Sequence, residues 1–285
     1  MGVVTIETHA FPSAPVYDSA QRDAVVTRSA RNLWRYRSLL RLLVERDVTV
    51  RYKRSMLGVW WTLLNPVLTM GVMWVVFSQL FKLPGGHVPY LVYLFSGLVV
   101  LNLFQQVVTA VGSSLTASST LLSRIRVPSE IFAVAAAGAV AVNFCISLAV
   151  LLVIEHFAGP GIPWTVVLAP LSIACILAFA TGLGLVVATL AVRFYDALEL
   201  TTVLITLLGY LTPTFYPESI VPDRFLPLVH ANPMYSQLRL FRDVVVEGRA
   251  SPGWVIIVAV TTAVAMLSVG AVIFARSWRS LAVML

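Results

Sequence analysis

Residues 51–82 decide the fold: RYKRSMLGVWWTLLNPVLTMGVMWVVFSQLFK. The stretch opens with three basic residues in four and then carries no formal charge from Ser55 to Phe81. About 20 apolar residues suffice for a helix to cross the hydrocarbon core of a bilayer, so this run predicts a transmembrane helix. The Asn65-Pro66 pair inside the run predicts a bend in that helix, because proline removes one backbone hydrogen bond.

The composition of the whole chain agrees with this interpretation. Of the 285 residues, 59% are hydrophobic and only 12% are charged, against about 25% charged in ordinary soluble domains. So few charges cannot cover the surface of a soluble fold, which predicts a polytopic membrane protein. The basic residues flank the apolar runs, so orientation in a bilayer explains the net charge of +7 better than binding to nucleic acid does.

Six charge-free stretches are long enough, or nearly so, to cross a bilayer. Trimmed at turn residues, they predict transmembrane helices at 57–81, 90–112, 131–154, 165–192, 199–216 and 253–275, of which the fifth is the shortest. With six spans both termini share one side, and that side holds 15 of the 20 Lys and Arg residues. Because positive residues favour the cytoplasmic side, both termini are predicted to be cytoplasmic.

The segment 31–56, which follows a predicted mobile tail at 1–30, favours an amphipathic helix. Its apolar stripe holds Leu33, Tyr36, Leu40, Val44, Val48 and Tyr52, and its polar stripe holds Ser38, Arg41, Glu45, Thr49 and Lys53. A basic helix of this kind lies in the membrane surface. It is either a passive anchor on anionic lipid or a docking surface for a cytoplasmic partner.

Two connecting segments carry helical patterns of their own. After the second span, Pro128-Ser129-Glu130 predicts a helix start with a serine cap, and the short polar segment before it is either a solvated connector or the part that a motor subunit pushes. On the opposite side, the 36 residues 217–252 are too few for an independent core. They predict two short helices that dip back toward the membrane, with a break at Asn232-Pro233.

Motifs for catalysis are not found in the sequence. A P-loop needs Gly-x-x-x-x-Gly-Lys-Ser/Thr, and neither Lys53 nor Lys82 follows a glycine. The four histidines lack metal-ligand spacing, so neither catalytic nor metal-binding residues are expected. No charged side chain lies at a predicted span centre, which argues against ion-coupled transport. Any driving force is therefore expected to arrive from another chain.

The spans carry aromatic side chains in place of charge. Most membrane aromatics face lipid or pack against other helices. The remainder are able to line a conduit for sugars, because aromatic faces bind the apolar faces of sugar rings without requiring charge.

The segment RDVTVRYKRSMLGVWWTLLNPVLTMGVMWVVFSQLF (46–81) resembles the start of the permease subunits of type-2 ABC exporters for polysaccharides. These include the O-antigen, teichoic-acid and cell-wall galactan exporters. The resemblance continues through LLSRIRVPSEIF (121–132), RFYDALELTTVLITLLGYLTPTFYPESIVP (193–222) and ANPMYSQLRLFRDVVVEG (231–248). It thus covers nearly everything after residue 30.

The resemblance implies an all-α polytopic membrane protein with six transmembrane helices within 57–275, an N-terminal amphipathic interface helix and two short outer re-entrant helices. It implies a homodimer docked on two copies of a cytoplasmic ABC ATPase, which would bind ATP and Mg, so no cofactor is expected in this chain. The cargo would be a polysaccharide linked to a polyprenyl pyrophosphate. The location would be the bacterial inner (plasma) membrane, with 276–285 as a cytoplasmic tail.

The resemblance also assigns roles to individual residues. ATPase coupling falls to a helix at 121–130, through Leu121, Leu122, Arg124, Arg126, Pro128 and Glu130, and the interface helix contributes Arg46, Asp47, Arg51, Tyr52 and Arg54. The channel-lining aromatics are Trp60, Trp61, Trp74, Phe77, Phe104, Tyr210, Phe215 and Tyr216. The outer gate, at 218–247, uses Pro217, Pro222, Asn232 and Pro233. Arginines near the inner face are able to meet the pyrophosphate bidentately.

Two other functions stay open on the sequence alone. A permease of the same architecture could export a drug or a lipid; the 46–81 motif and the lack of a soluble outer domain favour a glycan. A membrane glycosyltransferase would need acidic or histidine groups gathered in loops near the membrane, and the candidates are few and scattered.

Overall fold

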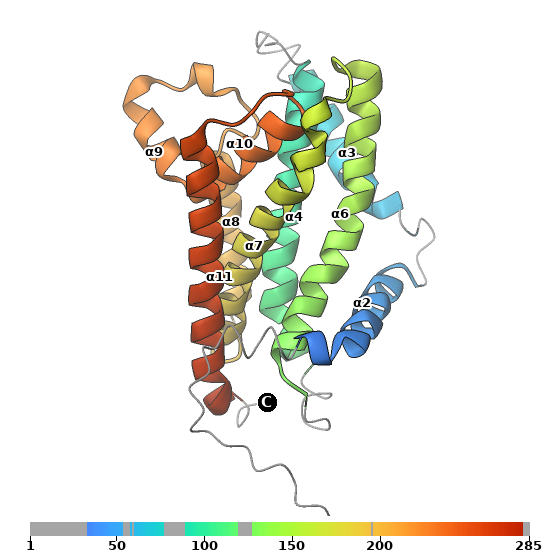
Figure 1. The fold of residues 1–285 in the computed structure, drawn as a ribbon, viewed down its shortest axis with the longest axis vertical. Coiled ribbons are helices and arrows are strands. Elements are labelled where there is room, and N and C mark those ends of the chain that lie inside the picture. The colour runs from blue at the N-terminus through green and yellow to red at the C-terminus, as the bar shows by residue number, and fades with distance from the viewer. Residues whose placement is uncertain are drawn as a thin grey trace, which may run out of the picture.

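The computed structural model describes residues 33–53, 58, 60–76, 89–118, 127–194 and 196–281, without the side chains of 61–63, 65 and 278–281. Within these residues the structure consists of helices, turns and irregular segments, with no strand (Figure 1). The prediction of an all-α chain is confirmed for this part.

Four helical segments are long and apolar enough to cross a membrane. They are α4 (Tyr90–Ala117), α6 (Glu130–Ala158), the 3-10 turn η2 (Trp164–Leu168) continued by α7 (Ala169–Ala191), and α11 (Gly253–Leu281). Two shorter apolar helices, α3 (Trp60–Val75, with Pro66 inside it) and α8 (Ala197–Leu211), occupy the predicted positions of the first and fifth spans. The described residues thus contain four helical segments of full spanning length and two shorter apolar helices in the predicted span positions.

Pro213 explains why α8 is short. The residue before a proline is disfavoured in the helical region, and Thr212 has extended backbone angles of φ −84° and ψ 140°. The predicted helix at 199–216 was therefore wrong in its last turn. Phe215 and Tyr216 lie beyond the helix end, in a turn.

α4 lies at the centre of the bundle, with α6 on one side and α7 on the other, and α11 packs on the far side of α7 (Figure 1). The α7–α11 contact depends on small residues. A Cβ on Gly182 would meet the backbone of Met266, and one on Gly270 would meet the carbonyl of Gly182. Such small-residue contacts let two helix backbones approach closely, as is common between helices in membranes.

α2 (Arg37–Tyr52) lies against the first turns of α6, at the end of the bundle where α11 finishes (Figure 1). Leu43 is buried there with Ile131, Phe132 and Ala135. The apolar stripe predicted for this helix is half-buried and the predicted polar stripe is exposed. The periodicity therefore identified the buried face correctly, and this end of the molecule is called the α2 end below.

The opposite end, called the α10 end, is built from residues 212–252 (Figure 1). It contains η3 (Glu218–Ile220), η4 (Asp223–Phe225), α9 (Leu226–Ala231) and α10 (Pro233–Val245). The first of the two short helices predicted within 217–252, before the break at Asn232-Pro233, is instead three short elements, because Pro217 and Pro222 each precede a separate 3-10 turn. The second predicted helix corresponds to α10.

Candidate functional site

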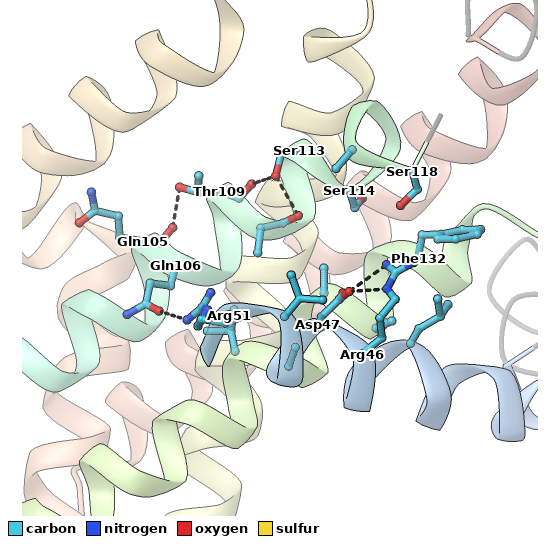
Figure 2. A pocket seen from close by; sticks show the side chains of 18 of the residues that line it. Arg46, Asp47, Arg51, Gln105, Gln106, Thr109, Ser113, Ser114, Ser118 and Phe132 are labelled. Atoms are coloured by element: carbon cyan, nitrogen blue, oxygen red, sulfur yellow. Dashed lines mark hydrogen bonds and ion pairs between the residues drawn. The ribbon is translucent and has the colours of Figure 1, made fainter. Parts of the chain in front are cut away.

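One face of α4 carries a stripe of polar side chains: Asn102, Gln105, Gln106, Thr109 and Ser113. Their spacing of three or four residues places them on one side of a helix. These residues belong to the half of α4 that faces α2 (Figure 2). A polar stripe inside an apolar bundle is costly unless its groups are hydrogen-bonded or serve a ligand.

Part of this stripe is satisfied within α4 itself. Thr109 Oγ1 donates to the carbonyl of Gln105 at 2.8 Å, and Ser113 Oγ donates to that of Thr109 at 2.9 Å. Asn102 Nδ2 donates to the carbonyl of Leu98 at 2.8 Å. Because the hydroxyl donors of Thr109 and Ser113 are used within the helix, their oxygen atoms are left as acceptors.

α2 supplies charge to the facing wall. Arg51 Nη1 donates to Gln106 Oε1 at 3.0 Å, and Arg46 donates to Asp47 Oδ1 from Nε at 2.9 Å and from Nη2 at 2.8 Å (Figure 2). Two guanidinium groups and one carboxylate leave a net charge of +1. Arg46 is paired with the carboxylate of its neighbour Asp47, whereas Arg51 donates to a neutral amide and has no ion pair among the described residues.

Between α2, α4 and α6 lies a groove of about 960 Å³, called the polar groove below. Its third wall is apolar and comes from α6, through Phe132, Ala135, Ala136 and Ala139. A cleft of this size is typical of sites for small molecules or for one part of a larger ligand. A positively charged wall opposite an apolar wall suits an anionic amphiphile.

The predicted interface-helix residues are thus divided between two tasks. Arg46, Asp47 and Arg51 line the polar groove. Tyr52 instead donates from its hydroxyl to Asn143 Oδ1 at 2.6 Å, which ties the end of α2 to α6. Arg54 lies outside the described residues.

The predicted coupling residues Leu121, Leu122, Arg124 and Arg126 also lie outside the described residues. Pro128 and Glu130 are described, and they stand where α6 begins. Ser129 occupies the N-cap position as predicted, but its side chain makes no capping hydrogen bond, so that part of the prediction was wrong.

The predicted channel aromatics differ in their surroundings. Phe104 is fully buried and stacks on Phe179 with ring centroids 5.5 Å apart. Its expected role in a channel between two subunits is therefore wrong, because the core of one chain covers the ring. Trp60 is 71% exposed and Trp74 lies partly exposed on the same helix. The Trp61 side chain and Phe77 fall outside the described part of the chain.

The other three aromatics gather where α8 ends, on a segment called the aromatic turn (residues 210–216). The Tyr210 and Phe215 rings lie 6.0 Å apart, and the Tyr216 hydroxyl donates to the carbonyl of Tyr210 at 3.1 Å. Tyr210 is 61% exposed. This cluster is the part of the predicted aromatic set that the structure brings together.

The predicted gate residues are positions where short helices begin and end. Pro217 and Pro222 precede η3 and η4, and Pro233 is the first residue of α10. Asn232 caps α10, since its side chain accepts from the Met234 N–H at 2.9 Å and its Nδ2 donates to Thr212 Oγ1 at 2.8 Å. The predicted break at Asn232-Pro233 is confirmed.

A carboxylate, Glu218, connects the segments of the α10 end. Its Oε1 lies 2.6 Å from His230 Nε2, and its Oε2 accepts from the Tyr235 hydroxyl at 2.8 Å, while Arg239 lies 3.6 Å away. Burial raises the pKa of Glu218, but the hydrogen bonds from His230 and Tyr235 and the charge of Arg239 outweigh burial. The pKa of Glu218 is therefore lowered overall.

Further ionic contacts lie on the neighbouring turns of α10. The fully buried carboxylate of Asp243 accepts from Arg249 Nε at 2.7 Å, and Arg249 also contacts Glu247 at 2.8 Å. Arg242 is only 5% exposed. Among the described residues, no three His, Cys, Asp or Glu side chains come close enough together to hold a metal ion.

Two sets of residues were not predicted from the sequence. The polar stripe of α4 was visible as polar positions at helical spacing inside a predicted span, and its signal was overlooked. Arg242 was not singled out within the segment 217–252. Its burial depends on tertiary contacts, so no local pattern could reveal it.

Known proteins resemble this chain over most of its length. The family described as ABC-2 type transporter matches residues 38–246. An O-antigen export system permease protein, RfbA, from Myxococcus xanthus is 32% identical over 225 residues, which cover 78% of this chain and 85% of that protein. Two proteins of the same name from Klebsiella pneumoniae are 25% and 23% identical, over 74% and 78% of this chain and 81% and 86% of theirs. With its apolar spanning helices, the chain is a multi-pass membrane protein of the permease kind, not an enzyme, and it belongs to the ABC-2 type transporter family.

Proposed function

We propose that this chain is the permease subunit of an ATP-driven exporter that moves a lipid-linked polysaccharide across the bacterial inner membrane. The observation that carries the proposal is the polar groove, in which Arg51 and the α4 amides face an apolar wall. A polyprenyl pyrophosphate offers both an anionic and an apolar part, and guanidinium groups bind phosphate through several hydrogen bonds at once. The O-antigen export permeases at 23–32% identity support the same class of cargo.

The proposed topology has six spans, with α3 and α8 as the two short ones. Both termini and α2 lie on the cytoplasmic side in this proposal, and the α10 end faces outward. The distribution of Lys and Arg supports this orientation, since 15 of the 20 fall on the side of the termini. In this topology three segments face the cytoplasm: the tail 1–30, the interface helix 31–56 and the coupling segment 121–130.

Two copies of the chain and two copies of a separate ATPase form the proposed machine. The ATPase binds ATP and Mg and pushes on the coupling segment and on α2, which Tyr52 ties to α6. The cargo binds at the polar groove by its pyrophosphate. Its sugars pass between the two copies and leave beside Tyr210, Phe215 and Tyr216.

The test is reconstitution of the chain with its co-expressed ATPase in lipid vesicles. We expect polyprenyl-pyrophosphate-linked polysaccharide to stimulate ATP hydrolysis and to become accessible on the other side of the membrane. The unlinked polysaccharide and a polyprenyl monophosphate serve as controls and should stimulate weakly. Stimulation by a drug or a simple phospholipid, without any response to the linked polysaccharide, would identify a different cargo and overturn the proposal.

A further inference from the structure

The helix end at Leu211 leaves backbone carbonyls without partners inside the helix. The last carbonyls of any helix lack intrahelical donors and form the negative end of the helix dipole. Here the chain continues through the Pro213 break as an irregular turn rather than a second helix. Buried carbonyls in such a turn need donors from elsewhere in the molecule.

Three side chains supply those donors. Arg242 Nη1 donates to the carbonyl of Pro213 at 2.6 Å, and its Nη2 donates to that of Thr214 at 3.0 Å. Tyr90 donates to the carbonyl of Phe215 at 2.6 Å, and the Tyr93 hydroxyl lies 2.9 Å from the carbonyls of Pro213 and Tyr216. Each carbonyl from residue 213 to 216 thus has a donor within hydrogen-bond distance.

Arg242 also binds α4 directly. Its Nη2 donates to the carbonyl of Tyr93 at 3.0 Å, its Nε donates to Ser96 Oγ at 3.2 Å, and the guanidinium carbon lies 3.7 Å from the centre of the Tyr93 ring. These contacts all go to neutral groups, and the structure shows no ion pair for Arg242 within the part it describes. Burying a cation without an ion pair costs solvation free energy. The four oxygen acceptors around Arg242 offset part of this cost.

The contact surface on α4 is shaped for this side chain. A Cβ on Gly97 would collide with Arg242 Nη2 and would lie 2.8 Å from the carbonyl oxygen of Thr214. Only a glycine leaves room at this position for the guanidinium and the turn together. On the other side, α10 is itself fixed, because Thr165 Oγ1 donates to the carbonyl of Val244 at 2.6 Å and Gln237 Nε2 to that of Ala259 at 2.9 Å.

We infer that Arg242 is a positioning residue for export: it holds the backbone of the aromatic turn against α4 and thereby sets where Tyr210, Phe215 and Tyr216 stand. The inference rests on the proposed function, in which these rings border the exit path of the glycan. Arg242 does not touch the cargo. It acts through carbonyls, so its charge and its planar shape are both required, and lysine, with a single nitrogen, cannot replace all of its contacts.

The experiment measures turn position and export separately. In a background without Cys145 and Cys175, a Phe215→Cys reporter is labelled with a membrane-impermeant maleimide, in the complex with the ATPase and without cargo. We expect Arg242→Gln to raise the labelling rate at least fivefold and Arg242→Lys to raise it less. The same substitutions, made without the reporter, should lower the amount of glycan exported per ATP hydrolysed.

Gly97→Ala tests the same contact without changing any charge or hydrogen-bonding group. The added methyl group should displace the guanidinium, so labelling should rise and coupling should fall as with Arg242→Gln. Gly253→Ala is the matched control, since nothing lies within 4 Å of a Cβ there, and it should behave as the parent. If Arg242→Gln does not assemble, Ser96→Ala removes one acceptor only and should give a smaller rise in labelling.

Unchanged labelling in both Gly97→Ala and Arg242→Gln, or in Ser96→Ala where Arg242→Gln does not assemble, would overturn the inference. So would faster labelling with full coupling of export, because the turn position would then not matter for transport. A parent complex that hydrolyses ATP but moves no glycan would instead contradict the proposed function. The labelling comparison needs no cargo, so it still reports whether Arg242 holds the turn.

Discussion

The two ends of the molecule use polar side chains in opposite ways. At the α2 end, the groove wall is partly exposed, and among the described residues Arg51 has a hydrogen bond to the neutral amide of Gln106 and no ion pair. At the α10 end, Arg242 is almost completely buried and Asp243 is fully buried, and both are committed to protein partners. These charged groups thus differ in their surroundings: Arg51 lies exposed beside a neutral amide, whereas Arg242 and Asp243 are buried and contact other parts of the protein.

This difference suggests that polar groups at one end contribute to ligand binding and those at the other end to the stability of the fold. A polar group that is already paired inside the protein stabilises the fold, and exchanging its partner for a ligand brings little gain. A charge that faces a groove with a neutral partner has more to gain from an anion. We therefore expect substitutions at the α10 end to change stability, and substitutions in the polar groove to change the response to cargo.

The largest effect is expected from Asp243→Asn. The substitution removes the charge that Arg249 Nε contacts at 2.7 Å in a buried position, and hydrogen bonds to charged groups contribute about 1.5–3 kcal/mol. Thermal unfolding of the purified complex should occur at a clearly lower temperature. Glu247→Gln, which also removes a carboxylate beside Arg249 but at a more exposed site, should cost less. If the unfolding temperature fell equally in the two variants, burial would not determine how much each carboxylate stabilises the fold.

Arg51→Ala is expected to have the next largest effect, and it should weaken the binding of cargo. Loss of one charge-assisted contact to phosphate corresponds to about a tenfold change in affinity. The concentration of linked polysaccharide that half-maximally stimulates the ATPase should rise by that factor, while the unfolding temperature stays close to that of the parent. Arg41→Ala is the matched control, because Arg41 is exposed on the opposite stripe and paired with Glu45. A similar shift in both variants would mean that general surface charge, and not the groove, attracts the cargo.

A smaller effect, dependent on pH, is expected from Glu218. The pKa of Glu218 is lowered in the folded protein below its ordinary value of 4.5. The ionised form of Glu218 therefore stabilises the fold fully at pH values above 4.5. That contribution should be lost as the pH falls from there through the lowered pKa. The group is about one third exposed, so less than about 1 kcal/mol is expected. Unfolding temperatures of the parent and Glu218→Gln, measured between pH 7 and pH 3, should converge in the acid range; a constant difference would exclude this linkage.

The smallest effect is expected from Glu45→Gln. Arg41 and Glu45 form an exposed pair one helical turn apart, at 2.8 Å, and such pairs contribute about 0.3–0.5 kcal/mol. Neither the unfolding temperature nor cargo-stimulated ATP hydrolysis should change measurably in moderate salt. A large loss of the ATPase response to cargo would instead indicate that the cargo binds to the exposed face of α2.

The spacing of apolar residues correctly predicted helices that have one buried face and one exposed face. The α2 stripe from Leu33 to Tyr52 is an example, because an amphipathic pattern reports burial directly. The break at Asn232-Pro233 was predicted for a similar reason, since capping and proline chemistry act over a few residues.

The remaining features depend on contacts between distant segments. Arg242 belongs to a helix whose polar residues would be assigned to a solvated face, yet it joins Tyr93 to Thr214 across more than a hundred residues. Phe104 matched an aromatic channel pattern, but the ring of Phe179 covers it. Composition alone does not distinguish a lumen aromatic from a core aromatic.

The length of α8 has a consequence for the surrounding lipid. Its 15 residues extend about 22 Å, whereas the apolar layer of a bilayer is about 30 Å thick. Lipid tails beside this helix have to shorten or tilt, or water has to reach down to the break at Pro213. In the proposed topology, a sugar polymer that moves along α8 would therefore be dehydrated over only about three quarters of the bilayer, and the outermost part of its passage would be wet.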